Sequence, residues 1–310
     1  MRRTLPIYAV LLSLTLPNVY SDTKEDSKEL AAKQKKAADQ KAEATRLIAA
    51  VAEETDEAAK KKARTKAAAS LEAAQDQWTE VREFVGEKWK GYPRFIDRKQ
   101  NPEQYAARAR AEIAYIKAQL EVANCLYLSA RIAESDKGRD ESLELAAKQY
   151  EEIHQKYRSM VGGLSARLWM ARCYQEQDNI RSALGITNEI LAHPSRLSVL
   201  QLLQDQALQI RLTCLNHPKR RDYQLVMAEG KEWIVDVEDK REASQAGQAI
   251  RWELARAHEL HAQAPSTPDA ERTPLLIEAL AIAKSLKKTK GPLQKQADAK
   301  VTELEKQLGL

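Results

Sequence analysis

The sequence has one pair of neighbouring histidines, His258 and His261, in the segment HELH. Their spacing of three residues within a helical pattern places both on one helix face, close enough to share a metal ion. Zinc needs further protein ligands, and the metalloprotease arrangement requires a spacing of four residues, which HELH lacks. We therefore expect these histidines to pack or to cap a helix, and we expect no metal site.

A second group of metal-ligating side chains is the acidic segment ESDKGRDES, residues 134–142. It supplies oxygen ligands but lacks the alternating Asp/Asn residues and the distal Glu of a calcium loop. The composition is that of a turn between two helices.

Three cysteines, Cys125, Cys173 and Cys214, lie far apart along the chain, and their spacings match no metal motif. Each lies in an apolar helical pattern, where a free Cys acts as a small buried hydrophobe. The sequence has no Gly-rich phosphate loop, no GxSxG segment and no Ser-His-Asp or Cys-His arrangement that its spacing supports. We therefore predict that the protein is not an enzyme and needs no cofactor, and an enzyme subunit is the least favoured alternative.

The formal net charge is +5, from 50 basic and 45 acidic residues. The basic clusters at Lys219–Arg221 and between Lys284 and Lys295 are short, and short clusters at helix ends are usually solvated. Binding to nucleic acid needs a larger basic surface, so no nucleic-acid partner is predicted.

The N-terminal segment, residues 1–21, has the pattern of an export signal. Arg2 and Arg3 precede an apolar stretch, Leu5 to Pro17, and the small residues Val19 and Ser21 favour cleavage before Asp22. The apolar stretch is too short to span a bilayer. We expect an exported protein, periplasmic or secreted, whose mature chain has no transmembrane segment; an uncleaved anchor is the alternative.

Residues 22–92 form a tract of Ala, Lys, Glu and Gln without proline until Pro93, and these residues favour helix. A heptad-like apolar stripe runs through its second half: Leu71, Ala74, Trp78, Val81 and Val85. Earlier positions offer mostly Ala. The tract predicts one long helix or a weak coiled coil, thinly supported before residue 71 and ended at Gly91-Tyr92-Pro93.

From about residue 102 the pattern changes to shorter helices that pair into hairpins, and no strand is predicted. Breaks are expected at Ser135–Asp140, Gly162-Gly163, Asp178-Asn179, His193-Pro194, His217-Pro218, Asp239-Lys240, Ala264–Pro274 and Gly291-Pro292. A polar helix from Leu293 to Leu308, within residues 293–310, would cap the array.

One helical pattern occurs twice. Arg167, Met170, Ala171, Arg172 and Tyr174 recur, with the same spacing, as Arg251, Leu254, Ala255, Arg256 and His258. The small residue of each set is where a second helix can cross closely.

The stretch 165–194 resembles the tetratricopeptide repeat, a helical hairpin. Met170, Ala171, Tyr174, Ala183 and Pro194 match its pattern, whereas Arg167 and Thr187 stand where large apolar or aromatic residues are usual. Other hairpins within residues 103–292 fit loosely. The resemblance implies an all-α fold in which the hairpins form a right-handed α-α superhelix after the N-terminal helix.

In proteins with this repeat, the first-helix face lines a concave groove. On that resemblance Leu168, Arg172, Trp252 and Arg256 would line the groove, and its arginines favour an acidic ligand. The predicted function is a non-catalytic scaffold of the bacterial envelope or secreted space that binds a peptide or protein.

The alternative is an oligomeric structural protein assembled through the N-terminal helix. An export signal, a helical arm and helical repeats together look like the periplasmic cell-division coordinator family. On this interpretation residues 22–90 would form a homo-oligomer.

Overall fold

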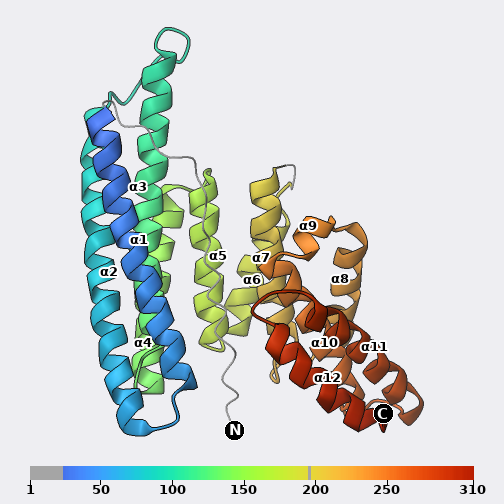
Figure 1. Cartoon of the computed structure of the whole chain (residues 1–310). Helices are drawn as coiled ribbons and strands as arrows, with labels where there is room; N and C mark the ends of the chain where they lie inside the picture. The colour runs from blue at the N-terminus through green and yellow to red at the C-terminus, as the bar shows by residue number, and fades with distance from the viewer. Residues whose placement is uncertain (1–23, 195–196) are drawn as a thin grey trace. The chain divides into compact units, whose positions relative to one another are not determined.

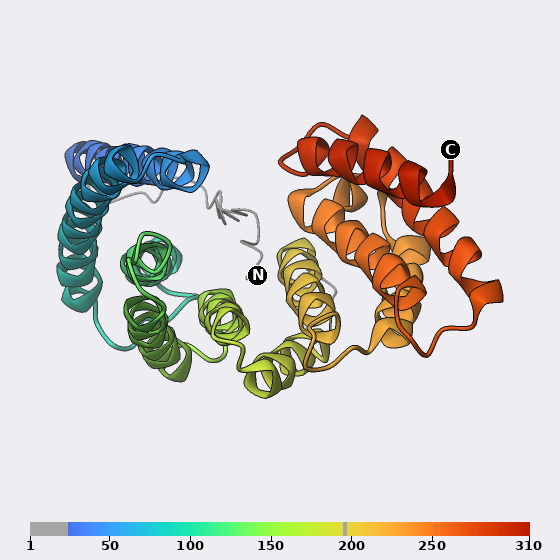
Figure 2. The ribbon, with the colours of Figure 1, turned by 90° about the horizontal axis from the view of Figure 1, so that it is seen from below.

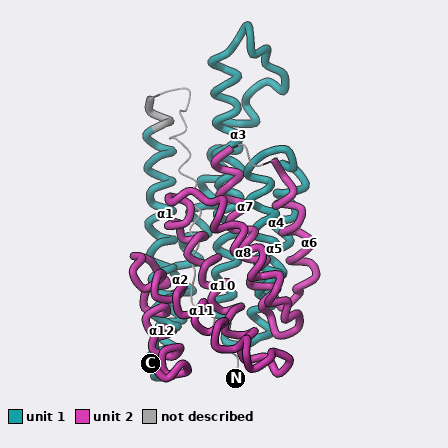
Figure 3. The backbone as a smooth tube through the Cα atoms, turned by 90° about the vertical axis from the view of Figure 1, so that its right-hand side faces the viewer, with its two compact units in different colours: residues 1–177 teal, residues 178–310 magenta. Residues whose placement is uncertain are grey.

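A computed structural model describes residues 24–194 and 197–310 (Figure 1). Within these ranges all regular secondary structure is helical and no strand occurs, which confirms the all-α class. The chain divides into two compact units, Met1–Gln177 and Asp178–Leu310 (Figure 3). The signal peptide expected over residues 1–21 lies outside the described residues.

Each helix of unit 1 packs against its neighbour in sequence, and α3 also contacts α5. The described helices are α1 (Lys24–Glu53), α2 (Glu57–Gly91), α3 (Pro102–Ser129), α4 (Asp136–Lys156) and α5 (Val161–Glu176). Helices α1 and α2 lie side by side and run in opposite directions (Figures 1 and 2). Sequential packing of this kind is typical of helical repeat proteins.

The single long helix expected over residues 22–92 is wrong, because the chain reverses between α1 and α2. The Asp56 side chain accepts a hydrogen bond of 2.7 Å from the backbone N–H of Ala59 and caps α2. Glu54 Oε1 accepts bonds from the N–H groups of Thr55 (2.9 Å) and Asp56 (3.0 Å). Acidic side chains thus satisfy the free N–H groups of this turn, which needs neither Gly nor Pro.

The apolar stripe predicted for the second half of this tract is confirmed as the buried face of α2. The same core contains residues of α1 and α3: Leu30, Ala37, Ala44, Ala114, Ala118, Val122 and Cys125. Small alanines let the helices approach closely. The stripe therefore packs within unit 1, which explains how a helix rich in Ala is held.

Unit 2 is arranged around α10, which contacts α7, α8, α9 and α11. Its described helices are α6 (Ile180–Leu191), α7 (Ser198–Leu215), α8 (Tyr223–Asp236), α9 (Asp239–Glu242), α10 (Gln245–Ala262), α11 (Asp269–Lys288) and α12 (Gln294–Leu308). The terminal helix α12 packs on α11 through Val301 and Leu304, which share one small core with Ala279 and Ala283.

Four of the eight expected breaks fall between helices, and the other four lie partly or wholly inside helices. Residues 136–140 belong to α4, and Asp239-Lys240 belongs to α9. Gly162 and Gly163 lie in the first turn of α5, after a turn at residues 157–160. Pro274 lies inside α11 rather than in a loop. Its position close to the N-terminal end limits the loss of helical hydrogen bonds, since only the Ala270 carbonyl loses its partner.

None of the helices in the described ranges combines the length and the apolar character that crossing a bilayer requires.

Candidate functional site

The four residues expected to line a groove occur as two pairs. Leu168 and Arg172 lie one turn apart in α5 of unit 1, and Trp252 and Arg256 lie one turn apart in α10 of unit 2. A spacing of four residues places each pair on one face of its helix, as expected. That the two pairs form one binding surface stays a prediction.

The α5 pair is mostly covered. Leu168 is 3% exposed and Arg172 is 9% exposed. Arg172 Nη1 donates a hydrogen bond of 2.9 Å to Oε1 of Gln175, a neutral acceptor one turn further along the helix. A ligand carboxylate would have to replace this contact to reach the guanidinium.

A buried polar cluster ties the end of α5 to α3. Arg131 donates to the Tyr127 hydroxyl at 2.8 Å and forms an ion pair with Glu176. The Tyr127 hydroxyl donates in turn to Glu176. Burial, together with the negative charge of Glu176, raises the pKa of Tyr127 well above its usual range. The hydroxyl therefore stays protonated, and the three side chains act structurally.

A second buried cluster links α1, α3 and α4. Lys41 and Glu121 form an ion pair, and Asn124 Nδ2 lies 3.5 Å from the same carboxylate oxygen. Tyr150 donates its hydroxyl proton to Asn124 Oδ1 at 2.6 Å. Removing one member would leave a buried polar group without its partner, which is costly, so the cluster fixes how these three helices meet.

The three thiols are buried, as predicted. Burial raises the pKa of Cys125 to about 12 and raises that of Cys173 beyond the usual range of a thiol. A nucleophilic cysteine needs a lowered pKa, because the thiolate is the reactive form. Cys125 and Cys173 therefore have the properties of core residues.

The α10 pair offers more surface than the α5 pair, since both side chains are half-buried. Arg256 Nη1 lies 3.0 Å from Oε2 and 3.1 Å from Oε1 of Glu253. Asn216, the residue that follows α7, donates to the same carboxylate at 2.9 Å and to the backbone carbonyl of Glu253 at 2.8 Å. The Arg256 charge is thus partly neutralised, and a ligand carboxylate would compete with Glu253.

His258 is buried in α10, with 2% of its surface exposed. Among the described residues, neither of its ring nitrogens has a hydrogen-bond partner. No group of three or more metal-ligating side chains occurs in the part of the chain that the structure describes. Burial, reinforced by the positive charge of Lys231, lowers the pKa of His258 to about 4. The imidazole is therefore neutral in neutral solution.

A buried carboxylate of α7 links this helix to α8 and α9. Asp205 is 1% exposed and accepts from Nε of Arg241 at 2.9 Å, within a two-point contact to the guanidinium. Trp233 Nε1 donates to Asp205 Oδ1 at 2.8 Å. All of these residues belong to unit 2. The contacts join three helices, and the sequence pattern of each helix alone does not predict them.

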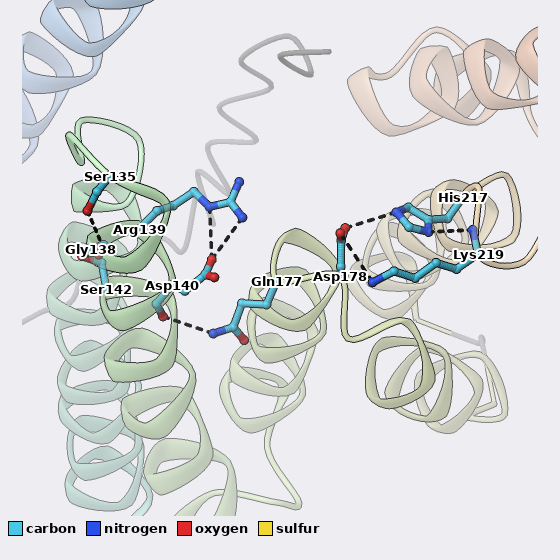
Figure 4. A network of polar contacts seen from close by, with 9 residues as sticks. All are labelled: Ser135, Gly138, Arg139, Asp140, Ser142, Gln177, Asp178, His217 and Lys219. Atoms are coloured by element: carbon cyan, nitrogen blue, oxygen red, sulfur yellow. Dashed lines mark hydrogen bonds and ion pairs between the residues drawn. The ribbon is translucent and has the colours of Figure 1, made fainter. Parts of the chain in front are cut away.

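Each unit has a group of polar contacts next to the ends of its helices (Figure 4). In unit 1 the Ser135 hydroxyl accepts from the N–H of Gly138 at 3.1 Å, and Gln177 donates to the carbonyl of Asp140 at 3.2 Å. The turn predicted for residues 134–142 is therefore limited to Glu134 and Ser135, and the prediction is wrong for residues 136–142, which form the first turns of α4 because Ser135 caps the helix there.

In unit 2 Asp178 adopts a left-handed backbone conformation with φ of 59°. Its carboxylate lies 3.1 Å from Nε2 of His217 and 3.7 Å from Nζ of Lys219 (Figure 4). These charged contacts hold the turn that precedes α6 against the turn after α7.

An aromatic cluster around a lysine was not predicted from the sequence. The Lys156 ammonium lies 5.3 Å from the ring centre of Trp89, 5.6 Å from that of Tyr115 and 5.3 Å from that of Tyr157. Trp89 and Tyr115 also stack, with centres 5.4 Å apart. The rings come from α2, α3 and the end of α4, so only the fold brings them to one cation.

Comparison with family models, with curated proteins and with solved structures finds no match to this chain.

Proposed function

We propose that the protein is a non-catalytic interaction scaffold that binds a peptide or protein partner in the bacterial envelope or the secreted space. The observation that carries this proposal is the packing of successive helices in each unit. Repeated helical hairpins of this kind present extended surfaces to other proteins. The tetratricopeptide-like pattern of residues 165–194 and the export signal at residues 1–21 support the finer form of the proposal.

The state of the titratable groups also favours a binding role over catalysis. A catalytic base or nucleophile works best when its pKa lies near the operating pH. Burial moves the pKa of Cys125 up to about 12 and that of His258 down to about 4, so the thiol stays protonated and the imidazole stays unprotonated at neutral pH.

We place the partner contact on α10, at Trp252 and Arg256. The indole gives a flat apolar surface, and the guanidinium can bind a carboxylate with two hydrogen bonds. Because Glu253 already pairs with Arg256, an acidic ligand exchanges one ion pair for another. The indole should therefore supply much of the affinity, and the arginine should supply selectivity for acidic sequences.

The test is binding of fluorescent acidic, neutral and basic peptides to the full chain, measured by anisotropy at two salt concentrations. We expect acidic peptides that contain an apolar residue to bind best and to weaken as salt rises. The double variant Trp252→Ala/Arg256→Ala should bind about tenfold more weakly. Arg220→Ala is the matched control, because Arg220 also lies in unit 2 and pairs with an acidic neighbour, Asp222. Equal loss in the control, or no loss in the double variant, would remove α10 as the contact.

The oligomeric alternative concerns residues 22–90. The apolar stripe of α2 packs within unit 1, which reduces the apolar surface that a second chain would use. Sedimentation of the full chain over a range of concentrations tests this alternative, because an oligomer built through α1 and α2 would sediment as more than one chain.

A further inference from the structure

The loop between α2 and α3, residues 92–101, is built to hold a defined shape. Ile96 is buried and anchors it. The Asp97 carboxylate accepts hydrogen bonds from the backbone N–H groups of Lys99 (2.7 Å) and Gln100 (3.2 Å). The Asp97 carbonyl accepts from the N–H of Asn101 at 2.8 Å. The conformation of the loop is therefore stabilised by the buried Ile96 and by the hydrogen-bonded turn at Asp97.

This ordered loop exposes a large apolar side chain. Phe95, next to the buried Ile96, is 84% exposed. Tyr105, in the first turn of α3, is 41% exposed. Leaving a phenyl ring in water is unfavourable, so a binding partner that covered Phe95 would gain the free energy of burying it.

Three basic residues lie close to Phe95 in the sequence of the same loop. Arg94, Arg98 and Lys99 are all exposed, and within residues 24–194 and 197–310 none of the three forms an ion pair with a carboxylate. The Arg98 guanidinium lies 5.8 Å from the ring centre of Tyr105. The nearby acidic side chain of Asp97 is already occupied by two backbone N–H groups. The same loop therefore exposes both positive charge and an apolar ring.

We propose that the Phe95 loop, residues 92–101 with the exposed side chains Arg94, Phe95, Arg98 and Lys99, docks on an anionic phospholipid membrane. A lipid surface has both properties that the loop requires: a boundary into which one ring can insert and a layer of phosphates for the cations. A protein partner would instead need a pocket for Phe95 lined with several carboxylates. The contact is peripheral and reversible, since it rests on one inserted ring and three basic residues.

This inference is independent of the proposed function, because the loop belongs to unit 1 and the proposed peptide contact belongs to α10 of unit 2. Failure of one leaves the other standing.

The first test locates the ring in the membrane. Phe95→Trp in the full chain is mixed with vesicles of phosphatidylcholine, with or without roughly one third phosphatidylglycerol, whose acyl chains carry bromine. We expect the variant to show quenching beyond that of the parent, with its five tryptophans, and only with the anionic vesicles. Equal quenching of variant and parent would overturn the proposal, whatever else in the chain binds lipid.

The second test measures affinity by co-sedimentation with the same vesicles. Phe95→Ala should weaken binding about tenfold, and Arg94→Ala/Arg98→Ala/Lys99→Ala about a hundredfold, since each base near an anionic surface is worth roughly fivefold. Val235→Ala is the matched control, because Val235 is 82% exposed but is followed by Asp236. Unchanged helicity by circular dichroism shows that the variants fold.

The pattern across the variants decides the outcome. Loss in the basic triple variant without loss in Phe95→Ala would mean general charge attraction, and the proposed insertion would be wrong. Saturable binding of the loop to an acidic protein, with no difference between vesicle types, would also overturn the membrane assignment.

Discussion

Gly163 and Gly247 occupy the same place in their helices: each is the third residue, of α5 and of α10 respectively. A Cβ atom built on Gly163 would lie 2.0 Å from the carbonyl oxygen of Tyr157, and one built on Gly247 would lie 2.4 Å from that of Arg241. Tyr157 and Arg241 precede their glycines by the same number of positions. The repeat found in the two helices thus extends into the turns that precede them, where the backbone passes too close for any side chain.

Replacing either glycine by alanine should therefore destabilise its unit by about 1 to 3 kcal/mol, because backbone must move to admit the methyl group. Chemical denaturation followed by circular dichroism measures the loss. Gly185→Ala is the control, since nothing lies within 4 Å of that Cβ position in the middle of α6. There the replacement should stabilise by about 0.5 to 1 kcal/mol. Equal effects at all three sites would contradict the close approach.

His258 should make unit 2 sensitive to acid. The pKa of this imidazole is about 4 in the fold and about 6.5 in an unfolded chain, so the unfolded chain binds a proton first as the pH falls. The neutral imidazole contributes fully to the free energy of unfolding above about pH 6.5. This contribution, about 3 kcal/mol, is lost as the pH falls from about 6.5 to about 4. Stability measured across this range should fall less steeply in His258→Leu than in the parent.

The charged groups around His258 are Lys231, Glu278 and His261, and all of them remain in that variant. His193→Leu, at an exposed histidine, should keep the parent's pH dependence. If His258→Leu also kept it, the imidazole would not be desolvated as described.

Lys156→Met should destabilise unit 1 by about 0.5 to 1 kcal/mol, because it removes the cation between three rings while keeping a similar stem. Denaturation monitored by tryptophan fluorescence reports both the stability and the surroundings of Trp89. Lys148→Met, at an exposed lysine of the same helix, should have little effect. Equal stability of the two variants would show that the rings gain nothing from the cation.

Asp205→Asn should cost about 3 kcal/mol, because the amide cannot accept both guanidinium bonds and leaves the Arg241 charge without its counter-ion. The midpoint of chemical denaturation measures the change. Asp298→Asn, in the exposed pair with Lys287, should leave the midpoint almost unchanged. A small effect at Asp205 would mean that water replaces the carboxylate.

The sequence predicts those features of the fold that depend on local patterns. The stripe Leu71, Trp78 and Val85 identifies the buried face of α2, and Asn179 marks the start of α6, where its side chain accepts from the N–H of Ser182 at 3.3 Å. The reversal at Glu54–Asp56 is missed because its capping residues occur in a tract of strong helix formers, without Gly or Pro.

The candidate site is less predictable, because its properties depend on packing between distant segments. The spacing of Trp252 and Arg256 predicts a common face, but not the carboxylate of Glu253 that occupies the arginine. Lys156 gives no signal in the sequence, since two of its three rings lie in helices far from it along the chain. The exposure of Phe95 depends on Ile96 turning inward, and neighbouring apolar residues in a loop do not reveal which one is buried.

The reversal between α1 and α2 has a practical consequence for anything joined to the N-terminus. Because the two helices run in opposite directions, Lys24 and Gly91 lie at the same end of unit 1 (Figure 1). A tag, a tether or a reporter domain fused ahead of Lys24 would enter the fold beside the loop that carries Phe95. The turn at residues 54–56 lies at the far end of the hairpin, and a label inserted there would leave that loop unobstructed.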